Sequence, residues 1–132
     1  MCEMLGMTAK RKRRANGLLR EFYSHAEAHP HGWGLSRFPA GVAPVIEKEA
    51  VKATESEHLK RVLAEPLEER MLLAHIRLAT VGHIEYENCH PFTAADNRGR
   101  TCLIIVACSL LCASRARSIS CSVAKRIILR TS

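Results

Sequence analysis

The chain opens with Met1-Cys2-Glu3-Met4-Leu5-Gly6-Met7, and this stretch decides the fold that we expect. Residues 2–7 form a short apolar segment, as in a buried first strand. Methionine aminopeptidase removes Met1 when a small residue such as Cys follows, so the mature protein would begin at Cys2. The free α-amine of Cys2, with a usual pKa of about 8, can then take the proton of the thiol. Because the thiolate is the reactive species, the stretch predicts an N-terminal nucleophile that carries its own base.

Outward from this strand, the apolar pattern predicts short strands mixed with two helices. Leu18, Leu19, Phe22 and Ala26 follow helical spacing, and two glycines and a proline interrupt the pattern at 29–34. We expect helices at 16–28 and 56–63, strands at 35–38, 43–47 and 71–80, and a polar loop at 83–93. This mixture indicates an α+β domain. The basic cluster Lys10–Arg14 is expected to be a solvated loop, with a phosphate or nucleic-acid site as the alternative.

Two internal segments carry residues that point to a binding site. In His31-Gly32-Trp33-Gly34-Leu35, the paired glycines allow the backbone to pass close to another segment, although a turn with a core tryptophan is an alternative. In the segment 74–82, Arg77 follows an apolar strand, where an arginine is costly to bury without an anion. Its planar guanidinium suits a carboxylate held by two hydrogen bonds. The alternative is an internal salt bridge, to Glu3 or Glu85.

Five segments in order resemble the class II glutamine amidotransferases, members of the N-terminal nucleophile (Ntn) hydrolases, and most closely their small stand-alone branch. The segments are Met1–Met7, His29–Leu35, Glu47–Ala53, His75–Gly82 and Asn88–Phe92. The resemblance covers residues 1 to about 101. It implies the N-terminal part of a four-layer αββα sandwich, incomplete in this chain.

The resemblance also implies roles for individual residues. Cys2 would attack the side-chain amide of glutamine, releasing ammonia and leaving a γ-glutamyl thioester that water converts to glutamate. The Cys2 α-amine would act as base and then acid, while Arg77 holds the substrate α-carboxylate and Thr80 supports it. Gly32 and Trp33 would shape the pocket wall. No cofactor and no metal are implied.

The histidines outside this set are expected to have no chemical role. We interpret His90 as an architectural loop residue rather than a catalyst. The remaining histidines at 25, 29, 58 and 83 are expected at the surface.

The composition changes abruptly near residue 98. Residues 1–97 hold 13 basic and 13 acidic residues, whereas 98–132 hold seven basic residues, no acid and four of the six cysteines. The family pattern continues with a His-Asn-Gly strand, which supplies the oxyanion hole, and a Thr-Asp-Ser-Glu stretch that binds the substrate ammonium; neither occurs here. We therefore expect a partial amidotransferase domain at 1–101 and a frameshift-derived, non-homologous tail at 102–132. Such a chain should be poorly soluble and impaired in catalysis.

Three other interpretations compete with this one. The first is an Ntn amidohydrolase acting on another γ-glutamyl or peptide substrate. The second is a non-catalytic basic protein whose tail contacts nucleic acid or an acidic membrane. The third, a zinc site built by Cys89, His90 and the tail cysteines, is disfavoured because the tail has no Cys-x-x-Cys spacing.

Glutamine is thus the expected small-molecule partner, with no nucleic acid and no membrane. Residues 102–113, the longest apolar run, are too short to span a bilayer, and no signal peptide is evident, so a cytoplasmic location is expected. The sequence identifies neither a synthase partner nor an acceptor for the ammonia.

Overall fold

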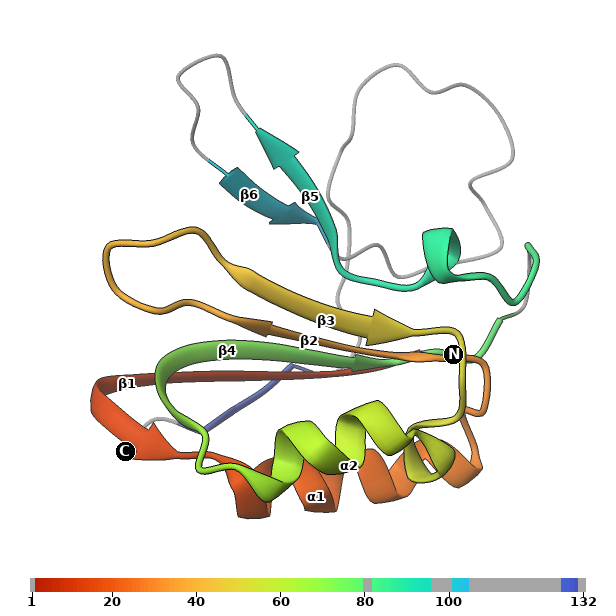
Figure 1. Ribbon diagram of the computed structural model, residues 1–132, viewed down its shortest axis with the longest axis horizontal. Helices are drawn as coiled ribbons and strands as arrows, with labels where there is room; N and C mark the ends of the chain where they lie inside the picture. The colour runs from red at the N-terminus through yellow and green to blue at the C-terminus, as the bar shows by residue number, and fades with distance from the viewer. Residues whose placement is uncertain (1, 80–81, 96–100, 105–126, 131–132) are drawn as a thin grey trace.

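Two helices pack against one face of a five-stranded sheet, which confirms the expected α+β class (Figure 1). The structure, a computed structural model, describes residues 2–79, 82–95, 101–104 and 127–130. The sheet has the order β3-β2-β4-β1-β7, and a separate β5–β6 hairpin lies on the side away from the helices (Figure 1). The elements are β1 (Glu3–Arg14), α1 (Asn16–Ser24), β2 (Trp33–Arg37), β3 (Val45–Glu49), α2 (Glu57–Ala64), β4 (Glu68–Ile76), β5 (Phe92–Ala95), β6 (Thr101–Ile104) and β7 (Ile127–Arg130).

The core lies between the helices and the sheet face that they cover. β4 runs antiparallel to both β1 and β2, which places Leu5, Leu35 and Ala74 side by side in register. Because side chains alternate along a strand, one residue in two faces the helices. The largest buried apolar side chains are Leu5, Leu19, Phe22, Tyr23, Trp33, Leu35, Leu59, Leu72 and Ile76.

The first strand is longer than the sequence predicted, and the expected loop at Lys10–Arg14 is wrong. These residues belong to β1, because Arg13 and Arg14 pair with Glu69 and Glu68 of β4. The run is exposed to solvent, as expected. The register shifts between Thr8 and Arg13, so that residues 9–12 of β1 stand opposite Arg70 alone. This is a large bulge, which a sequence of exposed cations does not reveal.

Other boundaries differ from expectation by a few residues. The helix expected at 16–28 is α1 followed by a 3₁₀ turn at His25–Glu27. α2 begins after Ser56, whose Oγ accepts the N–H of Leu59 at 2.9 Å in an N-cap. The strand expected at 35–38 begins at Trp33, and the one expected at 71–80 is β4, which begins at Glu68.

The junction between β1 and α1 is held by one buried asparagine. Asn16 donates from Nδ2 to the carbonyl oxygens of Leu63 and Glu65, at 3.0 and 2.8 Å, and accepts the N–H of Leu67 on Oδ1 at 2.9 Å. Ala15 adds a backbone hydrogen bond to Leu67 of 2.8 Å. The end of β1 is therefore fixed to the start of β4.

Candidate active site

Cys2 lies at the start of β1, beside the segment that follows β4. Glu3 pairs with Ile76, so the residues after Ile76 continue past Cys2. The Cys2 Sγ is 3.8 Å from the carbonyl oxygen of Leu78, and the side chain is partly buried. The fold thus brings the predicted nucleophile Cys2 and the segment that contains Arg77 and Leu78 to the same end of the sheet.

Arg77 is buried, with 5% of its surface exposed. Its Nη1 donates to the carbonyl oxygen of His83 at 3.2 Å. Among the described residues no carboxylate lies within ion-pair distance of its guanidinium, and Glu3 pairs instead with His25 at 3.0 Å. The salt bridge to Glu3 or Glu85, considered above, is therefore not formed in this part of the chain. A buried guanidinium with one backbone acceptor is suited to an anionic ligand.

His31 fixes the backbone around Arg77 and was not predicted from the sequence. Its N–H donates to the carbonyl oxygen of Arg77 at 3.0 Å, and its Nδ1 accepts the N–H of Ala79 at 2.8 Å. That acceptor role requires an unprotonated Nδ1, so the neutral ring carries its proton on Nε2. The N–H of Arg77 donates to the carbonyl oxygen of Gly32 at 2.8 Å. Both ends of the segment 77–79 are thereby tied to the segment 31–32.

The two glycines of the predicted motif allow the close backbone approach that was expected. Gly32 has φ +139°, and a Cβ there would lie 2.7 Å from the Cys89 Sγ. A Cβ on Gly34 would lie 1.8 Å from the carbonyl oxygen of His90, which is backbone and has no freedom to move aside. The loop at 89–91 therefore packs directly on β2.

Trp33 belongs to the core on the helix side of the sheet. Its indole is fully buried, meets Tyr23 edge to face with ring centroids 6.0 Å apart, and stacks on His58 at 5.8 Å. Its Nε1 donates to Glu49 at 3.1 Å. The Trp33 side chain therefore occupies a core position, which was the alternative considered above. Any contribution of Trp33 to a pocket wall would come from its backbone.

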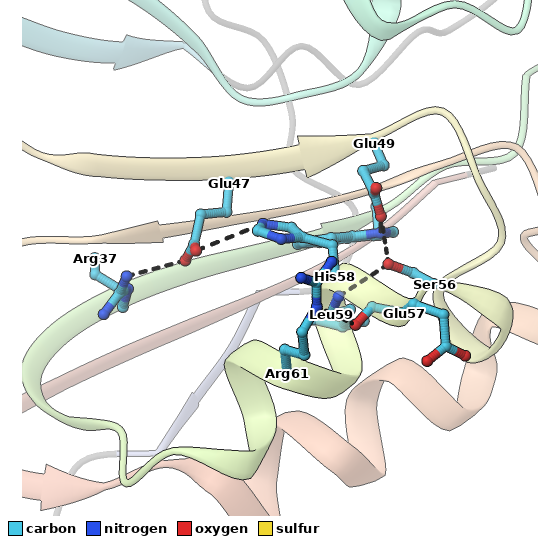
Figure 2. Close-up of polar contacts among 9 residues, drawn as sticks. Arg37, Glu47, Glu49, Ser56, Glu57, His58, Leu59 and Arg61 are labelled. Carbon is cyan, nitrogen blue, oxygen red and sulfur yellow. Dashed lines mark hydrogen bonds and ion pairs between the residues drawn. The ribbon is translucent and has the colours of Figure 1, made fainter.

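A polar network links β3 to α2 around this indole (Figure 2). Ser56 donates from Oγ to the Glu49 carboxylate, and Glu47 lies 3.0 Å from Arg37 and 3.6 Å from His58. The His58 side chain is 40% exposed, so it lies at the surface while its ring contacts this network. Of the other histidines expected there, His25 and His83 are exposed and His29 is partly buried.

His75 and His90 form a buried pair near Arg77. The rings of His75 and His90 meet edge to face at 4.7 Å, and neither His75 nitrogen has a hydrogen-bond partner in the described part of the chain. Burial, assisted by the nearby cations, lowers the pKa of His75 to about 3 and that of His90 to about 4. Both rings are neutral at physiological pH and pack as apolar groups, in keeping with an architectural His90.

Lys48 supports the same loop from β3; it lies in the segment Glu47–Ala53 of the family resemblance, but no role was predicted for it. Its Nζ donates to the carbonyl oxygen of Cys89 at 2.8 Å and lies over the ring of Phe92 at 4.9 Å. Burial lowers the pKa of the Lys48 ammonium group. The Cys89 thiol is also buried, and burial raises its pKa. The raised pKa makes the Cys89 thiol a poor nucleophile.

Three further expectations concern Thr80, metal ligands and membrane-spanning helices. Thr80 lies outside the described residues. Within those residues no three His, Cys, Asp or Glu side chains gather as ligands for a metal ion. At nine and eight residues, α1 and α2 fall short of the thickness of a bilayer, and none of the described helices could span one.

The first strand of the α+β sheet thus begins next to a cysteine, and a buried arginine follows the strand that pairs with it. The family model of the class II glutamine amidotransferases matches residues 1–107. The chain belongs to this family.

A relative supports the assignment over much of the same range. An uncharacterized protein of Methanocaldococcus jannaschii, MJ1515, is 37% identical over 92 residues, which cover 70% of this chain and 26% of that protein. The chain therefore spans about a quarter of the length of this relative. No solved structure matches the chain significantly.

Proposed function

We propose that the chain binds glutamine at Arg77 and attacks its side-chain amide with Cys2, as a glutamine amidotransferase. The observation that carries this proposal is the position of Arg77. Its guanidinium is buried at the end of the sheet where Cys2 lies, and no described carboxylate neutralises it. Removing a charge from water without a partner is costly, which favours a ligand that brings a carboxylate.

The proposed reaction uses the N-terminus left by removal of Met1. The Cys2 α-amine takes the thiol proton, and Sγ attacks the amide carbon of glutamine. The protonated amine then gives its proton to the departing ammonia as the thioester forms. Water, activated by the same amine, hydrolyses the thioester to glutamate and frees the thiol.

Arg77 orients the substrate for this attack. The guanidinium N–H groups that have no acceptor among the described residues can hold the α-carboxylate by two hydrogen bonds, and Thr80 is proposed to add another. The backbone of Gly32 and Trp33 is proposed to form the adjoining wall, fixed by the hydrogen bond from Arg77 to Gly32. Another γ-glutamyl compound with a free α-carboxylate would satisfy the same groups.

Turnover is proposed to be slow. The Asn-Gly pair that supplies the oxyanion hole in the family does not follow β6 in the sequence, and losing one such donor typically costs about 10²–10³ in rate. Residues 1–101 are proposed to be the first part of a four-layer sandwich. The binding and acylation steps are then better tests of the site than the release of ammonia.

The proposed nucleophile can be tested by covalent capture with a chloroketone analogue of glutamine. The thiolate displaces chloride, so intact-mass and peptide mapping report which cysteine forms the thioether. We expect a mature chain without Met1 and a single adduct on Cys2, lost in Cys2→Ser and kept in Cys89→Ser. Labelling of other cysteines at the same rate as Cys2, or retention of Met1 with an unreactive Cys2, would refute the proposal.

A further inference from the structure

The bulge in β1 gathers six cations at the far end of the sheet. We name this surface the basic arm and define it as Lys10, Arg11, Lys12, Arg13, Arg14 and the facing Arg70. All six side chains are exposed. The arm lies at the opposite end of β1 from Cys2 (Figure 1), so a molecule bound there leaves the proposed glutamine site open.

The acidic residues that balance the charge of residues 1–97 in the sequence do not neutralise the arm. None of its six cations forms an ion pair with a described residue. The nearest acids in register are Glu68 and Glu69 of β4, so residues 9–14 together with 68–70 carry a net charge of +4.

The root of the arm is firmly attached to the core. Ala15 and Asn16 follow the arm directly and are hydrogen-bonded to Leu63, Glu65 and Leu67. Arg13 and Arg14, which pair with β4, are thus presented from a fixed base, and the cations at 10–12 lie in the bulge beside them. Such an array suits a ligand with regularly repeated negative charge.

From this surface we infer that the arm binds the phosphate backbone of nucleic acid without reading its sequence. Residues 9–14 and 68–70 contain no aromatic side chain, and Met71 is the exposed large apolar residue that adjoins them. Protein interfaces are centred on aromatic and apolar anchors; arginine is enriched there, but lysine is depleted. Phosphate contacts, in contrast, can be made by lysine and arginine without an apolar anchor, and arginine matches phosphate with two hydrogen bonds. The expectation of no nucleic-acid partner relied on the equal numbers of acidic and basic residues in residues 1–97, a balance that does not hold at the arm.

The inference is tested by the anisotropy of a fluorescent mixed-sequence DNA duplex at about 50–200 mM salt. Neutralising about five phosphates predicts a slope of log K against log salt of about −4 to −5. In the variant Lys10→Gln/Arg11→Gln/Lys12→Gln we expect at least a tenfold (about 1.4 kcal/mol) loss of affinity at the lowest salt and a slope shallower by about 2–3. A scrambled duplex should bind equally well.

Two variants with the same loss of charge serve as controls. Lys52→Gln/Lys60→Gln/Arg61→Gln removes cations around α2, and Arg115→Gln/Arg117→Gln/Lys125→Gln removes cations from the tail. Both should retain most of the affinity, with circular dichroism confirming folding in each case. Equal losses in all three variants, a loss confined to the tail variant, or binding to anionic phospholipid vesicles but not to the duplex would each overturn the proposal.

Discussion

The N–H of Ala79 donates to Nδ1 of His31 at 2.8 Å, across 48 positions of sequence. Together with the bond from the His31 N–H to the Arg77 carbonyl oxygen, it fixes the chain on both sides of Leu78, the residue whose carbonyl oxygen faces Cys2. The spacing between the proposed nucleophile and the proposed carboxylate anchor therefore depends on a histidine that touches neither side chain in the described contacts.

This geometry predicts that His31 controls how well Cys2 is captured by the glutamine analogue. His31→Ala leaves the Ala79 N–H without an acceptor, at a cost of about 1–3 kcal/mol, so the capture rate should fall about tenfold. His31→Asn provides an oxygen near the position of Nδ1 and should retain most of the rate. His25→Ala, at an exposed position, is the control. If His31→Ala reacts as fast as this control, the two hydrogen bonds of His31 do not matter for the site.

Gly34 and Gly17 should respond to alanine in opposite directions. A Cβ at Gly34 meets the His90 carbonyl oxygen at 1.8 Å, so Gly34→Ala must displace backbone and should reduce the free energy of unfolding by about 2 kcal/mol or more. Gly17 lies in α1 with no atom within 4 Å of the added carbon. There alanine should stabilise by about 0.5–1 kcal/mol. Urea unfolding measures both, and a tolerated Gly34→Ala would contradict the packing of the loop on β2.

Stability should decrease as the pH falls below the usual pKa of histidine. The pKa of His75 is about 3 and that of His90 about 4 in the folded chain, against about 6.5 when unfolded. Between pH of about 6.5 and 4 the unfolded chain binds more protons, so each histidine removes about 1.4 kcal/mol per pH unit from the free energy of unfolding. Above this window the stability is fully present.

Replacing one buried histidine should flatten this dependence. His75→Leu keeps the site apolar and should reduce the slope by about one proton, whereas the exposed His83→Gln should leave it unchanged. Urea titrations between pH of about 4 and 7 give the slopes. If His75→Leu and the parent chain have equal slopes, the buried pair is not what titrates.

The origin of the tail can be settled at the level of DNA. We propose that residues 102–132 are read from a shifted frame, because the acid-free, cysteine-rich composition begins near residue 98, within ten residues of the end of the family match at residue 107. Resequencing across codons 98–110 should show that a neighbouring frame restores His-(Asn/Ser)-Gly and a later Thr-Asp-Ser-Glu. Absence of both motifs from all three frames would mean that the tail is genuine.

The sequence predicted the features that depend on local pattern. The helix around Leu19 and Phe22 follows from apolar spacing, and the need for glycine at 32 and 34 follows from the paired residues around Trp33. Features that depend on pairing across the chain were not predictable. β1 extends through Lys10–Arg14 only because Glu68 and Glu69 pair with its end, and that pairing left no local signal in a polar, exposed run.

Some residues of the candidate site could likewise be predicted from the sequence, and others could not. Cys2 and Arg77 were predicted from their residue types and their places at the ends of apolar segments. His31, Lys48 and the contact of His75 with His90 join segments between 15 and 48 positions apart, and no spacing rule connects them.

The pairing of Cys2 with Arg77 is tested most directly by protection. The rate at which iodoacetamide alkylates Cys2 should fall when glutamine is added, because the bound substrate covers the thiol. Protection should be lost in Arg77→Gln and retained in Arg61→Gln, a matched change in the exposed surface of α2. Equal protection in both variants, or no protection of the parent chain by glutamine at any concentration, would contradict the account.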